Sequence, residues 1–541
     1  MRIVWLFTST LCASFVPYCA AQTAAAKPIH CSVQKPVPET EADHLFASGD
    51  FAGAEKKFSE QLAATSGVMN YSGLIESQLE QGKLPEALAS AQKAQTAVQP
   101  AEGQNLLGEV YLRSGKIPDA LTAFKKALEL DQCSGRGHYG LGRVAELNSA
   151  HATAAREFGF AHKLSPADAE ISAAFFNTQP DEARLAGLQG LVAAKPMMAP
   201  AALEQIQTQV AILGQHKACV AVEAGSTTTE LELMPVLFNG KHARSWGLRT
   251  KLNDATTPLL ELDTSVDGIV LNESDAQKAG VKPLIAASAS VPYEGFVDKV
   301  QIGKLNYHDC PVRVVSNDAL AGGNSLIGAD FFRNRLIHVD YVNSKLTLRE
   351  LPARPGLGAN DVADRVISPE QKDWSPVYVA GPAVLLPTFI NKAGPYLFLM
   401  DTGIYRSVIA PAVTEGLLHP QGDRTLNLQG TSGSIVKVLR REGGGDTDKT
   451  EVRDSQGKLL PVTTPLKLPV FHFTNNEYPD NYSVSFDLSP TSQQAGVEVS
   501  GLLGFGTLQS YYLDIDYRDG LARILFDQNR TYETRTFDGY H

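Results

Sequence analysis

Two patterns of hydrophobic and polar positions divide this chain. Between about residues 39 and 217, alanines and larger apolar residues recur at helical spacing among polar ones, which predicts a series of amphipathic helices. From about residue 222 onward, β-branched and aromatic runs alternate with Gly, Asn, Asp and Pro, as in strands joined by turns. We therefore expect a helical part followed by an all-β part, in a chain whose 541 residues are too many for one core.

The helical part contains a repeat. Similar phrases begin at Gly49, Gly82 and Gly115, which follow one another at a step of 33 residues, and a weaker fourth copy covers residues 148–158. Glycine at the turn between two helices supplies a positive φ. Five residues after each glycine stands a small residue that lets two helices approach closely, and these are Ala54, Ala87 and Ala120.

This repeat resembles the tetratricopeptide repeat family over about residues 39–169, with further helix expected to about residue 217. The resemblance implies a domain at residues 39–217 in which helical pairs stack into a curved array. The concave face of such an array often binds a protein or peptide partner. The array can also serve only as a spacer or docking surface.

The β part contains a second duplication, which carries the candidate chemistry. Two apolar runs end in an acid followed by threonine, Asp263-Thr264 in the first copy and Asp401-Thr402 in the second. Each is followed downstream by two apolar residues and a glycine, and then, 12 residues after that glycine, by an aspartate. These later residues are Gly328 and Asp340 in the first copy, and Gly504 and Asp516 in the second. If the two turns face one another, their carboxyls cannot both ionise, so the pair would share a proton and activate a water.

Three phrases carry a resemblance to the retropepsin-like aspartyl proteases of the pepsin clan. They are Asp401-Thr402-Gly403, Leu502-Leu503-Gly504 and the closing Asp514-Ile515-Asp516-Tyr517. The resemblance covers about residues 230–527. It implies two tandem all-β units that face one another, at residues 222–352 and 376–541, joined by a linker at residues 353–375.

The same resemblance assigns roles to single residues. Asp263 and Asp401 would form a catalytic dyad that shares a water and hydrolyses a peptide bond in a protein or peptide substrate, without a metal or a cofactor. The residues expected to support the dyad are Thr264, Thr402, Gly403, Gly328 and Gly504. A substrate-covering flap would carry Gly430 and Gly433 at its tip in the second copy and lie near residues 291–296 in the first.

The copies also depart from the family pattern. Ser265 stands where the family has glycine, and Asp267 stands where it usually has a small hydroxyl residue. A further acid there would repel the shared negative charge and raise the pKa of the pair, so we expect activity at mildly acidic pH. In the second copy, Ile404 and Tyr405 stand where small residues are expected. Four interpretations remain open: a working dyad, a degenerate binding or scaffold module, a unit that pairs with another chain, and an unrelated β fold.

Composition and the first residues bear on the compartment and on the partners. A formal net charge of -11, without any basic run, argues against nucleic acid as a partner. Residues 1–21 have the charged start, apolar stretch and small-residue end of a secretory signal peptide. Because no later apolar run is long enough to span a bilayer, we expect an exported protein in the periplasm, at the cell envelope or in the medium.

Four cysteines lie outside this leader: Cys31, Cys133, Cys219 and Cys310. No two of them have the spacing of metal ligands, so a metal cluster is not expected. An exported protein can carry one or two disulfides, and buried free thiols are an equal alternative, so the pairing stays open. The chain also lacks a glycine-rich dinucleotide phrase after a strand, and no cofactor is expected.

Overall fold

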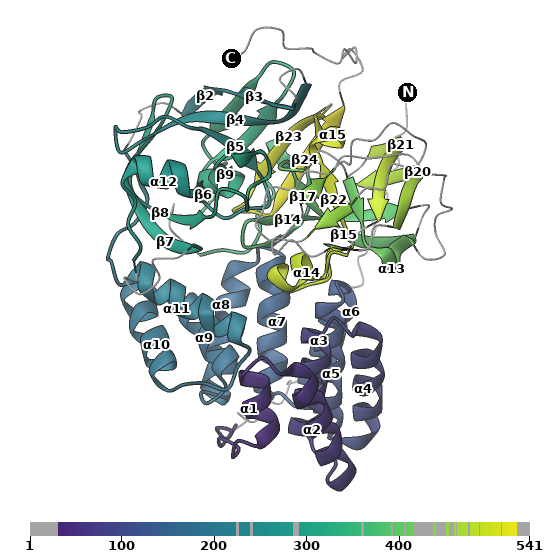
Figure 1. Cartoon of the computed structure of the whole chain (residues 1–541). Helices are drawn as coiled ribbons and strands as arrows, with labels where there is room; N and C mark the ends of the chain where they lie inside the picture. The colour runs from purple at the N-terminus through teal and green to yellow at the C-terminus, as the bar shows by residue number, and fades with distance from the viewer. Residues whose placement is uncertain are drawn as a thin grey trace, which may run out of the picture.

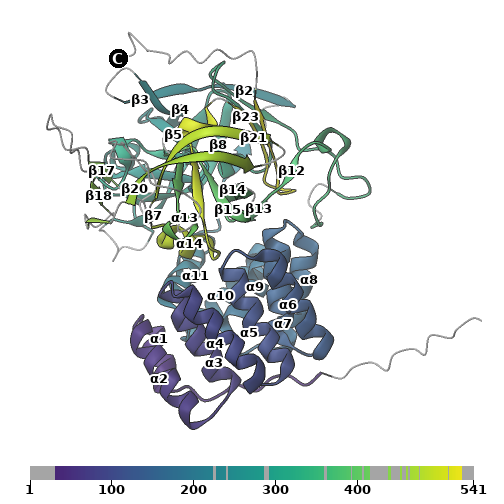
Figure 2. The ribbon, with the colours of Figure 1, turned by 90° about the vertical axis from the view of Figure 1, so that its right-hand side faces the viewer.

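A computed structural model gives the fold and describes residues 31–526 with internal gaps. The gaps are residues 223–226, 239–241, 285–290, 359–361, 391–392, 405–406, 415–436, 440–450, 454–458, 461–462, 474–475, 486 and 510. The helical part lies below the β part in Figure 1, and the view turned by 90° in Figure 2 shows the same two layers. The predicted order, helices first and a β-rich region after them, is confirmed.

The described residues of the helical part form a series of short helices in which consecutive helices pack against one another. They are α1 (Glu41–Ala47), α2 (Phe51–Ala64), α3 (Val68–Glu80), α4 (Leu84–Ala97), α5 (Pro100–Arg113), α6 (Ile117–Leu130), α7 (Gly135–Leu147), α8 (His151–Leu164), α9 (Ala169–Asn177), α10 (Asp181–Ala193) and α11 (Pro200–Leu213).

In each copy of the repeated sequence phrase, one helix ends and the next helix begins. Gly82 and Gly115 each adopt a φ of +70° between two helices, a conformation that side chains bearing a Cβ rarely adopt. Three residues later, Pro85 and Pro118 stand in the first turn of the next helix, where a missing N–H costs nothing. In the weaker fourth copy, Ser149 takes the turn with a φ of +53°.

The small residues of the repeat lie at the helix contacts, as predicted. Ala54, Ala87 and Ala120 are fully buried, and Phe124 is 2% exposed. A Cβ added at Gly108 would lie 2.7 Å from the Phe124 ring, so glycine on α5 makes room for the aromatic side chain of α6. Apolar burial of this kind, repeated along the array, is what stabilises helices that are too short to form alone.

The β part contains two sheets with matching topology. The first sheet has the order β1-β8-β6-β9-β5-β4-β3, with β7 paired to β4 and β8. Its strands are β1 (Val220–Val222), β3 (Met234–Phe238), β4 (His242–Leu252), β5 (Leu259–Asp263), β6 (Ile269–Asn272), β7 (Tyr293–Ile302), β8 (Leu305–Val315) and β9 (Leu326–Gly328), and α12 (Glu273–Ala279) follows β6.

The second sheet has the order β13-β14-β15-β22-β16-β21-β20. Its strands are β13 (Tyr378–Ala380), β14 (Ala383–Ile390), β15 (Ala393–Asp401), β16 (Ser407–Ile409), β20 (Thr463–Phe473), β21 (Asn476–Ser485) and β22 (Gly501–Gly504). The short helices beside it are α13 (Pro411–Thr414), α14 (Ser489–Ala495) and α15 (Phe505–Leu508). A small separate sheet joins β17 (Lys437–Leu439), β18 (Glu451–Arg453) and β19 (Leu459–Leu460).

A six-stranded sheet joins the two halves of the β part. Its order is β12-β24-β23-β10-β11-β2, and β10 of the first half pairs antiparallel with β23 of the second, with Ile337 opposite Ile515. The strands are β2 (Thr228–Glu232), β10 (Leu336–Asp340), β11 (Lys345–Arg349), β12 (Ser375–Pro376), β23 (Tyr511–Asp516) and β24 (Leu521–Phe526). The repeated phrase that ends in Asp340 and Asp516 therefore forms the strand pair that connects the halves.

A backbone hydrogen bond and a shared apolar core join the helical part to the β part, and a disulfide lies in each part. Arg113 at the end of α5 accepts a hydrogen bond from the N–H of Glu498 at 2.8 Å, and one apolar core runs from α5–α7 into both sheets. Disulfides join Cys31 to Cys133 and Cys219 to Cys310. The pairing that the sequence left open is thus defined, and the second bond ties Cys219, the residue before β1, to Cys310 of β8.

Candidate active site

Asp263 and Asp401 end equivalent strands. Asp263 closes β5 and pairs in register with Gly328 of the parallel neighbour β9. Asp401 closes β15 and pairs in register with Gly504 of the parallel neighbour β22. Asp263 is fully buried and Asp401 is 2% exposed. The sequence phrases that looked duplicated therefore occupy matching places in the two sheets.

The threonine after each aspartate bonds to the opposite copy. The N–H of Thr264 donates to Oγ1 of Thr402, and the N–H of Thr402 donates to Oγ1 of Thr264, both at 3.2 Å. The Thr264 hydroxyl donates to the carbonyl of Met400 at 2.6 Å, and the Thr402 hydroxyl to that of Leu262 at 2.9 Å. Each hydroxyl thus both donates and accepts, and the four bonds hold the two turns face to face.

Backbone N–H groups meet each carboxyl. Oδ1 of Asp401 accepts from the N–H groups of Gly403 at 3.0 Å and Ile404 at 3.2 Å. Oδ1 of Asp263 accepts from the N–H of Ser265 at 2.8 Å and from its hydroxyl at 2.6 Å. Ser265, which departs from the glycine of the family pattern, keeps the backbone donor and adds a second one.

The two carboxyls interact electrostatically. Burial raises the pKa of Asp401 well above its ordinary value of 3.8, and the neighbouring charge of Asp263 raises it further, while the N–H groups of Gly403 and Ile404 lower it. A carboxyl that is buried beside a second carboxyl keeps its proton, because two negative charges in a low-dielectric site repel. The pair can therefore hold one proton and one negative charge, which is the state that general acid–base chemistry on water requires.

Gly328, the last residue of β9, allows a close approach of backbone. A Cβ at Gly328 would lie 2.3 Å from both Oδ1 of Asp330 and the carbonyl oxygen of Val266. The N–H of Gly328 donates to the carbonyl of Gly268 at 2.6 Å, and in the second sheet the N–H of Gly504 donates to the Ser407 hydroxyl at 3.2 Å. These contacts fix the loop that follows each aspartate.

Asp267 bonds to a carboxyl that the sequence reasoning missed. It shares a hydrogen bond with Asp330 in η2 (Ala329–Phe332), and Asp330 is 5% exposed. Burial and the bond to Asp267 raise the pKa of Asp330 to about 7. From the sequence, Asp267 was expected only to raise the pKa of the Asp263 and Asp401 pair. The Asp330 signal was available, since the acid follows the repeated glycine by two residues, but the second copy has no counterpart there.

The predicted flaps are only partly within the described residues. Gly430 and Gly433 lie outside them. In the first copy, residues 293–296 of the predicted flap form the start of β7, which pairs with β8, and the N–H of Leu284 donates to the carbonyl of Glu294 at 2.8 Å. Residues 285–290, between these two, lie outside the described residues, so the flap near residues 291–296 stays a prediction.

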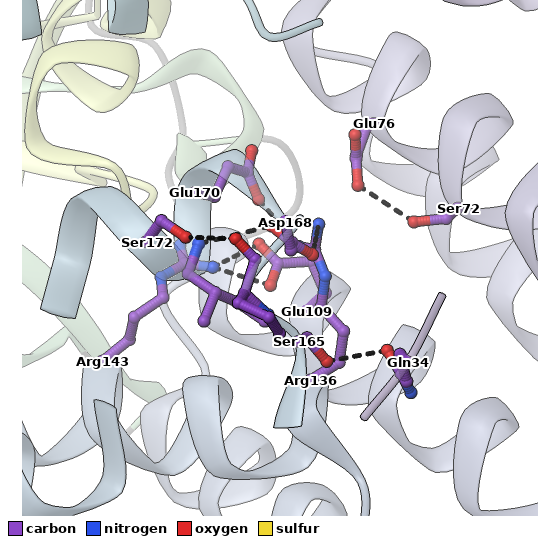
Figure 3. Close-up of polar contacts among 12 residues, drawn as sticks. Gln34, Ser72, Glu76, Glu109, Arg136, Arg143, Ser165, Asp168, Glu170 and Ser172 are labelled. Carbon is purple, nitrogen blue, oxygen red and sulfur yellow. Dashed lines mark hydrogen bonds and ion pairs between the residues drawn. The ribbon is translucent and has the colours of Figure 1, made fainter. Parts of the chain in front are cut away.

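A second cluster of polar residues lies between α3, α5, α7 and α9 (Figure 3). Arg143 contacts both carboxylate oxygens of Glu109 at 2.7 and 2.6 Å, and Arg136 contacts Glu170 at 2.7 Å. In both pairs the partner stands 34 residues away, so the bonds join equivalent places of neighbouring repeats. Glu76 accepts a hydrogen bond from Ser72 at 2.9 Å, and burial, followed by the charge of Glu170, raises the pKa of Glu76 to about 8.

The comparisons with known proteins bear on the helical part most directly. Residues 40–102 and 105–169 match the model of the tetratricopeptide repeat family. The chain therefore carries a tetratricopeptide repeat array followed by a β-rich region, and the predicted repeats are confirmed. A search of curated proteins finds no match to the sequence.

Several solved structures are similar to parts of the chain. A thermophilic tetratricopeptide repeat protein from Thermus thermophilus has 20% identity over 32% of this chain and 95% of its own, with a TM-score of 0.26. MamA has 18% identity over 33% and 98%, with a TM-score of 0.20. A retropepsin-like aspartic protease from Rickettsia conorii has 19% identity over 25% and 96%, with a TM-score of 0.18. At these TM-scores the likenesses carry no argument about activity.

The described residues contain no metal cluster and no membrane-spanning helix. No group of three or more His, Cys, Asp or Glu among them could hold a metal ion. None of the helices within the described ranges has the length and apolar character needed to cross a membrane.

Proposed function

We propose that this protein is an exported aspartic endopeptidase in which Asp263 and Asp401 form the catalytic dyad. The observation that carries the proposal is the reciprocal bonding between Thr264 and Thr402, which holds two buried carboxyls at matching strand ends. A single buried aspartate could serve as a turn anchor. Two of them joined by a symmetric hydroxyl network are what proton sharing requires.

In this proposal the ionised carboxylate removes a proton from a water held between the two side chains. The water oxygen attacks the peptide carbonyl carbon, while the protonated carboxyl donates a hydrogen bond to the carbonyl oxygen. Collapse of the tetrahedral intermediate breaks the C–N bond, and a proton passes to the leaving amine nitrogen. The dyad ends the cycle with one proton, as it began.

The supporting residues act by fixing geometry. Thr264 and Thr402 hold the two turns, and Gly403 donates its N–H to Asp401. Gly328 and Gly504 let the neighbouring strands pass beside the two aspartates, which stand opposite them in register. Positioning of this kind lowers the barrier because the groups need not reorganise during the reaction.

The repeat array and the compartment complete the proposal. The array binds a protein or peptide partner, and its contact with the β part through Arg113, Glu498 and a shared apolar core supports a role in presenting substrate. The two disulfides support an oxidising compartment, in agreement with the leader-like residues 1–21. Periplasm, cell envelope and medium all meet that condition.

A second candidate function is a non-catalytic binding module that keeps the protease-like arrangement. The observation that favours it is the burial of the dyad, because Asp263 is fully buried and a catalytic water needs access. The departures at Ser265 and Ile404 agree with it. In this function the aspartates are turn anchors, and the array alone contacts the partner.

Cleavage of an unfolded protein substrate across pH separates the two. We expect the wild type to cleave it, Asp263→Asn and Asp401→Asn to lose the activity, and a hydroxyl-bearing transition-state mimic to inhibit it. Asp298→Asn is a matched control, because the Asp298 side chain on β7 is 71% exposed and pairs with Lys217. Equal cleavage by the wild type and Asp401→Asn would eliminate the enzyme and leave the binding module.

A further inference from the structure

Glu261 interrupts the apolar strand that carries Asp263. Side chains alternate along a strand, so Glu261 lies on the same face of β5 as Asp263, two residues away. In the second sheet the register position that matches Glu261 is Leu399: Glu261 stands opposite Leu326 in β9, and Leu399 stands opposite Leu502 in β22. One half of the site is therefore charged where the other half is apolar.

The partner of Glu261 comes from β4. Nη2 of Arg244 lies 2.6 Å from Oε2 of Glu261, and the two side chains are 6% and 0% exposed. The Ser245 hydroxyl donates to the other carboxylate oxygen. Gly322, with a φ of +70°, closes over the guanidinium, because a Cβ there would lie 2.6 Å from Arg244 Nη2. An ion pair this enclosed is costly to desolvate, and an apolar side chain such as Leu399 at the matching position of the second sheet avoids the cost.

Glu261 also belongs to the electrostatic surroundings of the dyad. Burial raises the pKa of Glu261 to about 7, Arg244 and Ser245 lower it, and the charge of Asp263 raises it. In turn, the charge of Glu261 raises the pKa of Asp401, after burial and Asp263. The other charged or titratable groups around these carboxyls are Arg244 on β4, Tyr341 after β10, Tyr517 after β23, and the Asp267–Asp330 pair with Arg333.

We propose that Glu261, held by Arg244, is a positioning residue that determines the pH range over which Asp263 and Asp401 share a proton. Glu261 lies on the Asp263 face of β5, and its negative charge raises the pKa of Asp401, so each negative charge opposes the formation of the other. The dyad therefore keeps its proton to a higher pH than two aspartates beside a leucine would. This inference rests on the proposed function for its catalytic meaning, although the proton equilibrium exists without it.

The first experiment measures the pH profile of kcat/KM for cleavage of an unfolded protein. Glu261→Gln removes the negative charge and leaves Arg244 in place, so we expect the alkaline limit to move down by about one pH unit. The double variant Arg244→Leu/Glu261→Leu replaces the ion pair with two apolar side chains, in keeping with Leu399 at the Glu261 position of the second sheet, and is expected to shift the limit in the same direction. Glu230→Gln is the control, since Glu230 is 57% exposed and pairs with Lys345 on the surface. An activity loss without any shift would indicate a structural role and overturn the proposal.

The second experiment does not depend on activity. The free energy of unfolding of Asp401→Asn minus that of its parent changes with pH where the dyad titrates. We expect this change to occur about one pH unit lower in the Glu261→Gln background than in the wild-type background. The same pH in both backgrounds would overturn the role of Glu261. Absence of cleavage that depends on Asp401 would instead remove the proposed function, and the two failures are thus distinguishable.

Discussion

The Asp267–Asp330 carboxyl pair makes stability depend on pH in a direction opposite to that of most carboxylates. Asp330 is 5% exposed, and its pKa rises from the ordinary 3.8 to about 7 through burial and the bond to Asp267. Between these values the folded chain keeps a proton that the unfolded chain has released. Stability is therefore lost as pH rises from about 4 to about 7, and above that range the loss is complete and no longer depends on the pH.

Asp330→Asn removes this titration and keeps the contacts. The asparagine Oδ1 can accept from the N–H of Gly268, as Asp330 does at 3.0 Å, and its amide can donate to Asp267 in place of the shared proton. A rise from 3.8 to about 7 corresponds to at most about 4 kcal/mol. We expect the variant to match the wild type at about pH 4 and to exceed its free energy of unfolding by a few kcal/mol at about pH 8.

Urea denaturation followed by tryptophan fluorescence measures this difference. Outside the leader-like segment the tryptophans are Trp246 and Trp374, and both lie in the β part, so the signal reports the part that contains Asp330. Asp254→Asn is a control of opposite sign, because Lys251 and Lys299 hold the pKa of the exposed Asp254 below its ordinary value. A difference between Asp330→Asn and wild type that is the same at both ends of the pH range would refute the reasoning.

Three further predictions concern single contacts. Thr402→Val removes the hydroxyl that bonds to the N–H of Thr264 and to the carbonyl of Leu262, so we expect the free energy of unfolding to fall by about 2–4 kcal/mol in urea denaturation. Thr402→Ser keeps the hydroxyl and should retain most of that stability. Gly328→Ala forces a Cβ against the Val266 carbonyl and should cost about 1–3 kcal/mol, and no loss would contradict the close approach. Phe124→Ala leaves a cavity between α5 and α6 and should lower the free energy of unfolding by about 3–5 kcal/mol, measured by denaturation followed by the helical circular dichroism signal. An unchanged denaturation midpoint would contradict the burial of Phe124 in the core.

Local physics explains why the repeat array could be predicted in detail. Gly82 and Pro85 act within four residues of one another, because a positive φ ends one helix and a proline suits the first turn of the next. Ala87 and Phe124 recur at fixed distances from these turns, so their burial follows from helical spacing. The recurrence of the strand-Asp-Thr and apolar-Gly phrases, with the same step of 12 residues from each glycine to the later aspartate, likewise predicted which strands would be related.

The surroundings of the two aspartates could not be predicted in the same way. Asp330 and Arg244 reach the site from η2 and β4, and their contacts with Asp267 and Glu261 depend on how distant segments pair. The disulfide partners were open for the same reason, since Cys31 and Cys133 are separated by 102 residues. Hydrogen bonds and charges act over a few ångströms in space, and the separation of two residues in the sequence does not show whether they lie that close.

The sequence by itself determined the order of helical and β parts, the repeat step and the two candidate aspartates, because each depends on short-range backbone preferences or on a duplicated phrase. The tertiary structure alone decided that Thr264 and Thr402 bond across the two halves, that Ser265 donates to Asp263, and that Asp267 meets Asp330. These features arise where two sheets meet through β10 and β23, and only the fold brings those sheets together.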